Sequence, residues 1–253
     1  MKPLTLPALL IAVAALTAIP TIAHAQAAPA PAPPPPPGWI GSAGAGIALT
    51  SGNSDTSTVN AAYEVKRDTG SPFLFSSSGL LVWGKAQGEL TSDRLALEGR
   101  VERRLNPRTS LFAQTQYLRD SFKAIDYLVS PTVGLKRILF QNDRTELAVD
   151  GGVGIVWEQN PGLELQTDGA VTGSQQFRHK LTATTDVREQ VSALWKMDDF
   201  GDALYTFTTG MAATVTAATQ LKLEFLDTYK TKPPVDVQKN DIAVLVSFVY
   251  KFD

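Results

Sequence analysis

The feature that most constrains the fold is an alternation of apolar and polar side chains that recurs from residue 39 to the end of the chain. About twelve segments of roughly 10–13 residues show this period of two, which is typical of β-strands, and turn residues separate them. We find no sustained helical stripe there. We therefore expect an all-β protein with strands at residues 39–50, 55–67, 73–85, 92–104, 110–119, 126–138, 145–158, 170–182, 188–197, 203–215, 221–229 and 241–252.

The first 25 residues have the layout of a secretory signal peptide. Lys2 precedes an apolar stretch, and "AHA" at residues 23–25 fits an A-x-A cleavage site. A transmembrane anchor is the alternative, but the stretch is shorter than the ~20 residues that a spanning helix needs, and Pro7 and Pro20 interrupt it. We predict an exported protein that loses residues 1–25.

A proline- and alanine-rich linker follows at residues 26–38. Its "PAPAPPPPPG" run favours an extended, semi-rigid chain that cannot enter a hydrophobic core. Residues 39–253 then form one domain. The chain has no cysteine, so disulfides and thiolate metal sites are excluded. The net charge of −2 lacks the basic excess that nucleic-acid binding requires.

Two architectures fit many alternating strands behind a signal peptide. A soluble periplasmic β-rich binding protein would turn its apolar faces inward, whereas a transmembrane barrel turns them toward lipid. The segment lengths match the ~9–11 residues of a membrane-crossing strand better than the ~5–6 of soluble strands. Short turns such as "LNPRT" and "FQND" also alternate with longer polar loops, including residues 86–91, 120–125 and 159–169.

Aromatic residues support the membrane barrel. They gather near the expected strand ends, as two interfacial girdles would. The chain also closes on "VSFVYKFD", an aromatic-rich final strand. These aromatics are Trp39, Phe73, Trp83, Tyr117, Tyr127, Trp157, Trp195, Tyr205, Tyr229, Tyr250 and Phe252. We predict a transmembrane antiparallel up-and-down β-barrel of about 12 strands in the cell outer membrane. Its partners would be outer-membrane lipid, lipopolysaccharide and the barrel-assembly machinery, without a cofactor or nucleic acid.

The polar faces of these segments carry charges of both signs. In a barrel they would line the lumen, which at twelve strands is wider than side chains alone need fill. Rings of such charges can set the ion selectivity of a narrow pore, while paired charges can hold a closed or loop-plugged barrel together. The candidate lumen charges are Glu64, Lys66, Arg94, Glu98, Arg100, Glu102, Lys136, Asp150, Lys222 and Glu224.

Other polar motifs give weak signals. An outer-membrane lipid-modifying enzyme is the alternative function, but His179 is the one histidine after the signal peptide, and no Ser/Asp constellation accompanies it. "DDFGD" at residues 198–202 fits a solvated turn better than a cation site. "TSGNSDT" at residues 50–56 is interpreted as a hairpin connection, with lipopolysaccharide or an ion as the binding alternative. We predict no catalytic residue and no metal site.

Four stretches resemble the salt-induced outer membrane proteins (domain of unknown function 481, YdiY-like). They are "GIALTSGNSDTS" at 46–57 and residues 89–105, 112–137 and 229–252, and the most specific parts are "TSGN" and residues 122–126. The resemblance implies an integral outer-membrane barrel, structural or narrow and pore-like, with a role in envelope or salt stress adaptation. It implies no established activity and no catalytic residue.

Overall fold

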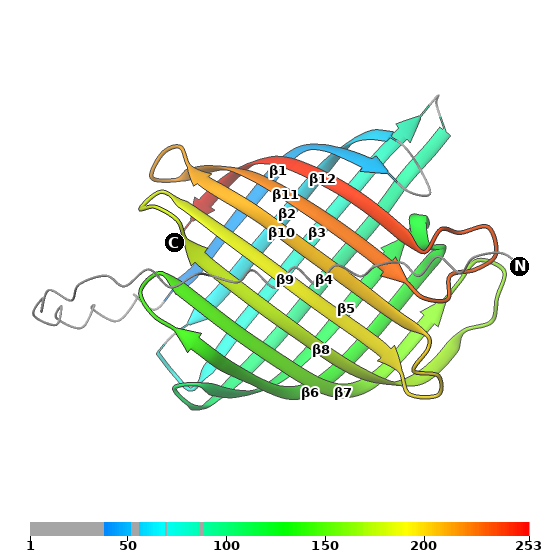
Figure 1. Ribbon diagram of the computed structural model, residues 1–253, viewed down its shortest axis with the longest axis horizontal. Coiled ribbons are helices and arrows are strands. Elements are labelled where there is room, and N and C mark those ends of the chain that lie inside the picture. Colours follow the sequence, from blue (N-terminus) through cyan, green and yellow to red (C-terminus); the bar gives the residue numbers. More distant parts are fainter. Residues whose placement is uncertain (1–37, 52–55, 69, 87–88, 253) are drawn as a thin grey trace, which may run out of the picture. The chain divides into compact units, whose positions relative to one another are not determined.

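The computed structural model describes residues 38–51, 56–68, 70–86 and 89–252, which form one closed barrel of antiparallel strands (Figure 1). The predicted fold class is confirmed, strand number included. The signal peptide, most of the linker, the centre of "TSGNSDT" and Asp253 lie outside the described residues. The strands are β1 (Gly38–Ser51), β2 (Thr56–Asp68), β3 (Phe73–Ala86), β4 (Glu89–Asn106), β5 (Thr109–Asp120), β6 (Ile125–Gln141), β7 (Thr145–Gln159), β8 (Gln166–Lys180), β9 (Thr185–Lys196), β10 (Ala203–Thr214), β11 (Thr219–Lys230) and β12 (Asn240–Phe252).

Each strand pairs with the next along the chain, and β1 closes the sheet against β12. The closing register runs from Gly41 opposite Phe252 to Ser51 opposite Ile242. Closure leaves no free edge, so each strand has a hydrogen-bonded neighbour on both sides, and where Pro131 interrupts the β6–β7 pairing the Ser130 hydroxyl donates to the Ile155 carbonyl. That is a requirement inside hydrocarbon, where water cannot replace a missing partner.

The two ends of the barrel differ in the length of their connections. One end carries turns of two to four residues, and it also holds the start of β1 and the end of β12. The opposite end, on the right in Figure 1, carries the three longest loops, which follow β7, β9 and β11. Short periplasmic turns and longer external loops are typical of outer-membrane barrels. We therefore call these the inner and outer ends.

The predicted strand ends were wrong in two outer hairpins. Glu89–Thr91 belong to β4, and β8 begins at Gln166, so the loops expected at residues 86–91 and 159–169 are shorter. In β8 the polar residues Gln166 and Thr167 pair with Glu158 and Trp157 of β7. Strands that continue beyond the apolar belt carry polar side chains on both faces. The alternation of apolar and polar residues therefore stops before the strand ends.

A short 3-10 helix, η1 (Ser121–Lys123), lies in the connection between β5 and β6. The sequence predicted a polar loop over residues 120–125, and the structure has a connection at 121–124 that contains one tight helical turn. Ala124, which follows η1, has a positive φ of 50°. This turn points the chain back toward β6 and lets Lys123 and Ile125 enter the mouth of the barrel, where both are buried.

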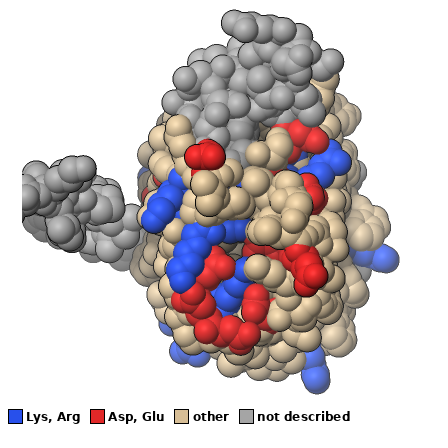
Figure 2. Space-filling view, turned by 90° about the vertical axis from the view of Figure 1, so that its right-hand side faces the viewer, with Lys and Arg blue, Asp and Glu red and all other residues tan. Residues whose placement is uncertain are grey.

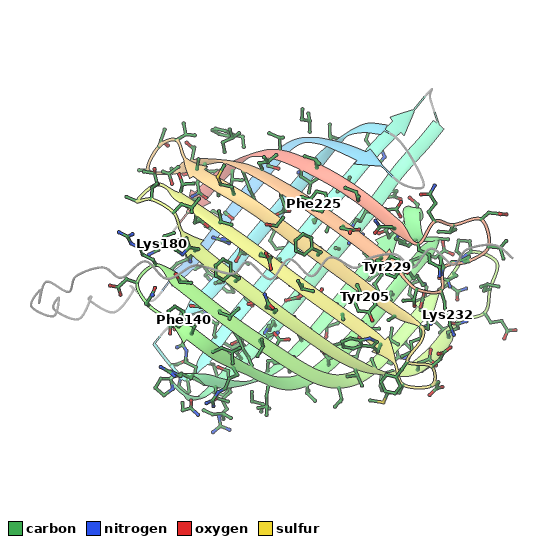
Figure 3. The ribbon with its side chains drawn as sticks, in the orientation of Figure 1. Phe140, Lys180, Tyr205, Phe225, Tyr229 and Lys232 are labelled. Carbon is green, nitrogen blue, oxygen red and sulfur yellow. The ribbon has the colours of Figure 1, made fainter. Side chains whose placement is uncertain are left out.

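The outward faces of the strands are apolar, as the alternation predicted. Ile47, Val133 and Phe248 are more than half exposed, which is unfavourable in water and suits contact with lipid. At the outer end Trp195 donates its indole N–H to Tyr205 at 3.0 Å, and Tyr205 packs against Tyr229 (Figure 3). A closed barrel with an apolar belt and interfacial aromatics is a membrane-spanning structure, and we place the protein in the outer membrane.

No helix within the described ranges is long and apolar enough to cross a membrane.

Candidate functional site

The candidate site is the interior of the barrel. Side chains on the polar faces reach one another between strands that are not neighbours in the sheet, which shows that they point inward. Arg94 of β4 donates to Thr228 of β11 at 3.2 Å, and Arg100 of β4 reaches Asp150 of β7 at 3.2 Å. Lys230 of β11 pairs with Glu158 of β7. These contacts cross the lumen.

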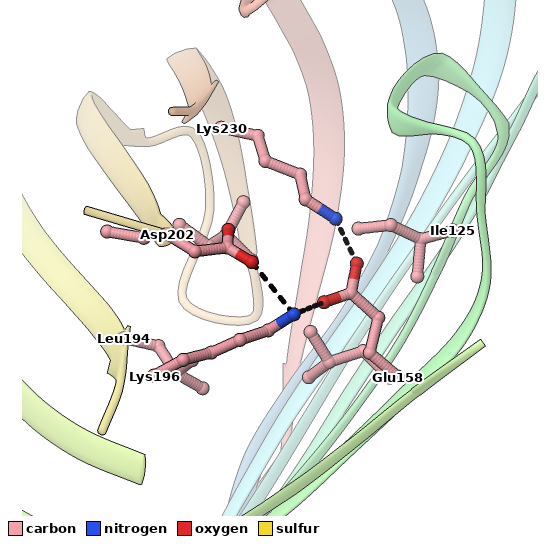
Figure 4. Close-up of a pocket in the computed structure, with 9 residues that line it drawn as sticks. Ile125, Glu158, Leu194, Lys196, Asp202 and Lys230 are labelled. Carbon is pink, nitrogen blue, oxygen red and sulfur yellow. Dashed lines mark hydrogen bonds and ion pairs between the residues drawn. The ribbon is translucent and has the colours of Figure 1, made fainter. Parts of the chain in front are cut away.

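An ion-pair network that we call the outer cluster comprises Glu158, Lys196, Lys230 and Asp202. Glu158 accepts from both Lys230 and Lys196, and the Lys196 ammonium lies 2.9 Å from Glu158 and from Asp202 (Figure 4). The Glu158 side chain is 2% exposed. The adjoining cavity of about 10 Å³ has room for roughly one water molecule. The cluster fills most of the space between its own side chains in this part of the mouth.

The loop containing η1 covers another part of the mouth. The Lys123 ammonium is fully buried and lies 2.7 Å from the Asp241 carboxylate of β12. It also donates to the backbone carbonyls of Gln238 and Lys239, at 3.3 and 2.8 Å. Burial lowers the pKa of Lys123, while the neighbouring Asp241 opposes that shift. Lys123 thus joins the β5–β6 loop to the β11–β12 loop. Figure 2 views this end, where basic and acidic side chains surround a hollow.

Beside this loop, Arg94 and Asp120 form a buried ion pair. Both side chains are under 10% exposed, and Arg94 continues to Thr228 on the other side of the lumen. Burying two charges is favourable only when geometry and additional hydrogen bonds compensate for lost hydration. The guanidinium can make several such bonds at once, because its donors have a fixed planar arrangement. The pair therefore connects opposite walls near the outer end.

An apolar layer lies immediately inside these charges. Two clusters of buried side chains point into the barrel, contributed by strands from β3 to β12. The sequence predicted a polar lumen, and this layer departs from that expectation. The inward apolar side chains include Val82, Leu118, Ile125, Leu128, Val156, Leu194, Leu226 and Leu245. They narrow the outer half of the lumen with surface that water and ions do not solvate well.

A second polar group, the middle cluster, is centred on Arg100. Its guanidinium donates to Glu102 at 2.8 Å and to Gln114 at 2.7 Å. It also lies over the ring of Phe112, 3.8 Å from the centroid. Phe112 fills the space above two inward glycines of β6 and β7, where a Cβ at Gly134 would lie 2.7 Å from the ring. The charged guanidinium of Arg100 thus packs on the face of the Phe112 ring in the middle of the lumen.

Polar residues next to Arg100 extend the middle cluster. Lys136 lies 3.5 Å from Glu102, and Gln116 donates to Glu98 at 3.2 Å. The middle cluster thus holds five of the ten lumen charges expected from the sequence, namely Glu98, Arg100, Glu102, Lys136 and Asp150. Arg94 belongs to the buried pair above.

The inner end holds the four other predicted lumen charges. Glu64 bridges Lys66 at 2.8 Å and Arg188 of β9 at 3.3 Å, so this contact also crosses between distant strands. Lys222 pairs with Glu224. The side chains of Glu64, Lys66 and Arg188 are 39–54% exposed. The pairs around Glu64 are thus far more exposed than the outer-end pairs, while Glu224 is 17% exposed.

Sequence reasoning missed the residues of the outer cluster and of η1. Two of them continue a pattern that was already recognised, because Glu158 is in phase with Asp150 and Lys230 is in phase with Lys222. Following the alternation to the last residue of each strand would have identified them. Lys123 and Asp202 lie in connections, where no periodicity applies.

The weaker motifs do not assemble a reactive site. His179 faces outward at the inner end, where its Nδ1 lies 2.8 Å from the Thr145 hydroxyl and its ring stacks on Phe177. Neither serine nor carboxylate is hydrogen-bonded to it among the described residues. In "DDFGD", Asp199 pairs with Lys232, and Asp202 joins the outer cluster. The described part of the chain contains no group of three metal-ligating side chains.

The fold is similar to those of solved outer-membrane barrels. The NanC porin aligns with a TM-score of 0.57 at 9% identity, covering 84% of this chain and 100% of that one. An outer membrane channel from Pseudomonas putida F1 gives 0.51 at 13% identity, covering 86% and 96%. The translocator domain of the autotransporter NalP from Neisseria meningitidis gives 0.51 at 9% identity, covering 85% and 88%. At such identities the likeness concerns the fold alone.

Comparison by sequence gives a family. No curated protein matches the chain. A family model described as "Protein of unknown function, DUF481" matches residues 43–252, which include nearly all of the barrel. This match confirms the resemblance to the domain of unknown function 481. The chain belongs to the DUF481 family of proteins of unknown function.

Proposed function

We propose that this protein is a channel-type outer-membrane barrel whose lumen is closed at its outer end in the resting state. One observation carries the proposal: buried ion pairs and a buried hydrogen bond join non-neighbouring parts of the barrel wall at the outer mouth. Lys230 contacts Glu158, Arg94 contacts Thr228, and Lys123 contacts Asp241. An ion crossing this layer would have to separate charges that are already paired and dehydrated.

The apolar layer supports the same function. Apolar constrictions oppose ion passage because they favour the loss of water from the pore. Ile125, Leu128 and Leu194 place such a surface next to the outer cluster. The exposed pairs around Glu64 lie at the inner end, which faces the periplasm in the orientation that we propose. The protein therefore acts as a structural barrel or as a narrow, normally closed pore, rather than as a general diffusion porin.

Planar-bilayer recording of the purified protein tests this proposal. We expect the wild-type protein to give rare, small conductance steps. Leu128→Ser, at a 4% exposed inward position, should wet the apolar layer and increase open time and step size. Leu135→Ser is a matched control on the same strand, because Leu135 faces outward and is 53% exposed. Continuous large conductance from the wild type, unchanged by Leu128→Ser, would refute a closed outer end.

A role in envelope or salt stress adaptation is the physiological part of the proposal. Its support is the family resemblance. A strain lacking the gene should grow more slowly than its parent at raised salt, and the wild-type gene should restore growth. Equal growth of both strains across salt concentrations would remove the stress role while leaving the bilayer result unaffected.

A further inference from the structure

Two polar side chains lie on the membrane-facing surface of β8 and β9. Arg188 points inward, since it reaches Glu64 on β2, so the next residue, Glu189, points outward. Gln175 pairs in register with the outward Val191, which is 37% exposed. Neither Glu189 nor Gln175 forms a hydrogen bond or ion pair with any residue that the structure describes. The lipid-facing belt thus contains an unpaired carboxylate beside an unpaired amide.

Both side chains lie at similar depth in the membrane. Glu189 is four residues from the inner end of β9, and Gln175 is five residues from the inner end of β8. At ~3.3 Å per residue and a tilt of ~40°, each lies on the order of 10 Å inside the inner end of the barrel. That depth falls within the apolar belt, where acyl chains cannot satisfy a carboxylate. A partner with hydrogen-bond donors would remove this penalty.

The surrounding surface permits close approach. Gly151 of β7, Gly173 of β8 and Ala193 of β9 are paired in register and form a row of small residues across three strands. This row is adjacent to Val191, and so to the two unsatisfied side chains, Gln175 and Glu189. In membranes, small residues favour association because they let two backbones come near each other. The Trp195 ring lies against Gly173, 3.5 Å from where a Cβ would stand, so Gly151 is the more open glycine of this row.

We infer that this face of β7–β9 is the contact surface for a second copy of the chain. Two copies in one membrane share the same orientation, so their two-fold axis runs along the membrane normal and preserves depth. Such an axis between Gln175 and Glu189 brings the amide donors of each copy to the carboxylate of the other. The contact is self-complementary, with one donor and one acceptor from each copy.

Cysteine cross-linking in intact outer membranes tests the inference, because the chain has no native cysteine. Val191→Cys places a thiol beside the proposed axis. Val101→Cys on β4 is the matched control, with the same 37% exposure and a comparable distance from the inner end, five strands away around the barrel. Oxidation should give a product of twice the chain mass for Val191→Cys and at least about tenfold less for Val101→Cys, the equivalent of ~1.4 kcal/mol.

Charge variants in the Val191→Cys background separate this contact from chance collision. Gln175→Glu would bring four carboxylates together and should lower the dimer yield about tenfold, again ~1.4 kcal/mol. Gln175→Lys pairs with Glu189 and should keep the yield. Heat-modifiable gel mobility verifies folding of each variant. Three outcomes would overturn the inference: equal dimer yields from Val191→Cys and Val101→Cys, a cross-linked product of another mass, or a dimer yield that Gln175→Glu does not change.

Discussion

Replacing Glu158 by glutamine tests whether the outer cluster stabilises the closed barrel. The carboxylate is 2% exposed and contacts two buried ammonium groups, those of Lys196 and Lys230. After the substitution Lys196 keeps Asp202 at 2.9 Å, whereas Lys230 loses its carboxylate partner in the cluster. Removing one member of a buried pair costs ~3–5 kcal/mol because the other charge stays buried. We expect a loss of ~3 kcal/mol, since only one of the two lysines is left without a carboxylate partner.

Urea unfolding in detergent micelles, followed by tryptophan fluorescence, measures this loss. Adding Lys230→Met to Glu158→Gln should recover most of the stability, to within ~1–2 kcal/mol of wild type, because no charge then lacks a partner. Glu64→Gln is the matched control: its carboxylate is 39% exposed, and an exposed pair contributes at most ~1 kcal/mol. If Glu158→Gln costs no more than Glu64→Gln, or if Lys230→Met fails to recover stability, the electrostatic account of the outer cluster is wrong.

Three further predictions concern other parts of the barrel. Phe112→Ala should destabilise it by ~3–5 kcal/mol in the same unfolding assay, because the ring is 1% exposed and fills the space above inward glycines. His179→Ala should change stability by only ~1 kcal/mol, the value of one hydrogen bond to Thr145, and should alter no lipid-hydrolysis signal in lipid extracts. The hydrogen bond from Lys232 lowers the pKa of Asp199. This loop pair therefore stabilises the folded protein at pH values above the usual aspartate pKa, and its contribution is lost as pH falls through the lowered pKa. Lys232→Ala should return the pKa of Asp199 toward its ordinary value in an NMR titration.

The strands could be predicted because one face of each strand contacts lipid and must be apolar. Along β12, Ile242, Val244 and Val246 face outward without interruption, and the period of two is unmistakable. The prediction failed where that requirement ends. At the outer end of β8 the chain leaves the apolar belt, and backbone pairing to β7 continues although the apolar alternation has stopped. Tertiary pairing, rather than local pattern, sets those boundaries.

The inward positions could be predicted, but their contacts could not. Alternation alone identifies Arg100 and Asp150 as facing the same side, yet their 3.2 Å contact depends on the barrel's curvature and on how far each side chain extends. The apolar layer has a similar origin. Leu128 and Val156 occupy inward positions that the alternation would assign to polar residues, because closed packing over the mouth outweighs hydration there.

The η1 loop supports the closed outer end that we propose. Residues 122–126 carried one of the most specific parts of the family resemblance, and Lys123 within them joins the β5–β6 loop to Asp241 at the start of β12. A fully buried ammonium needs several partners, and the carbonyls of Gln238 and Lys239 supply them. The inner turns offer no equivalent among the described residues, and ion pairs at that end are more exposed. One side chain thus joins two loops that are distant in sequence, and the closed state that we propose would rest on this contact.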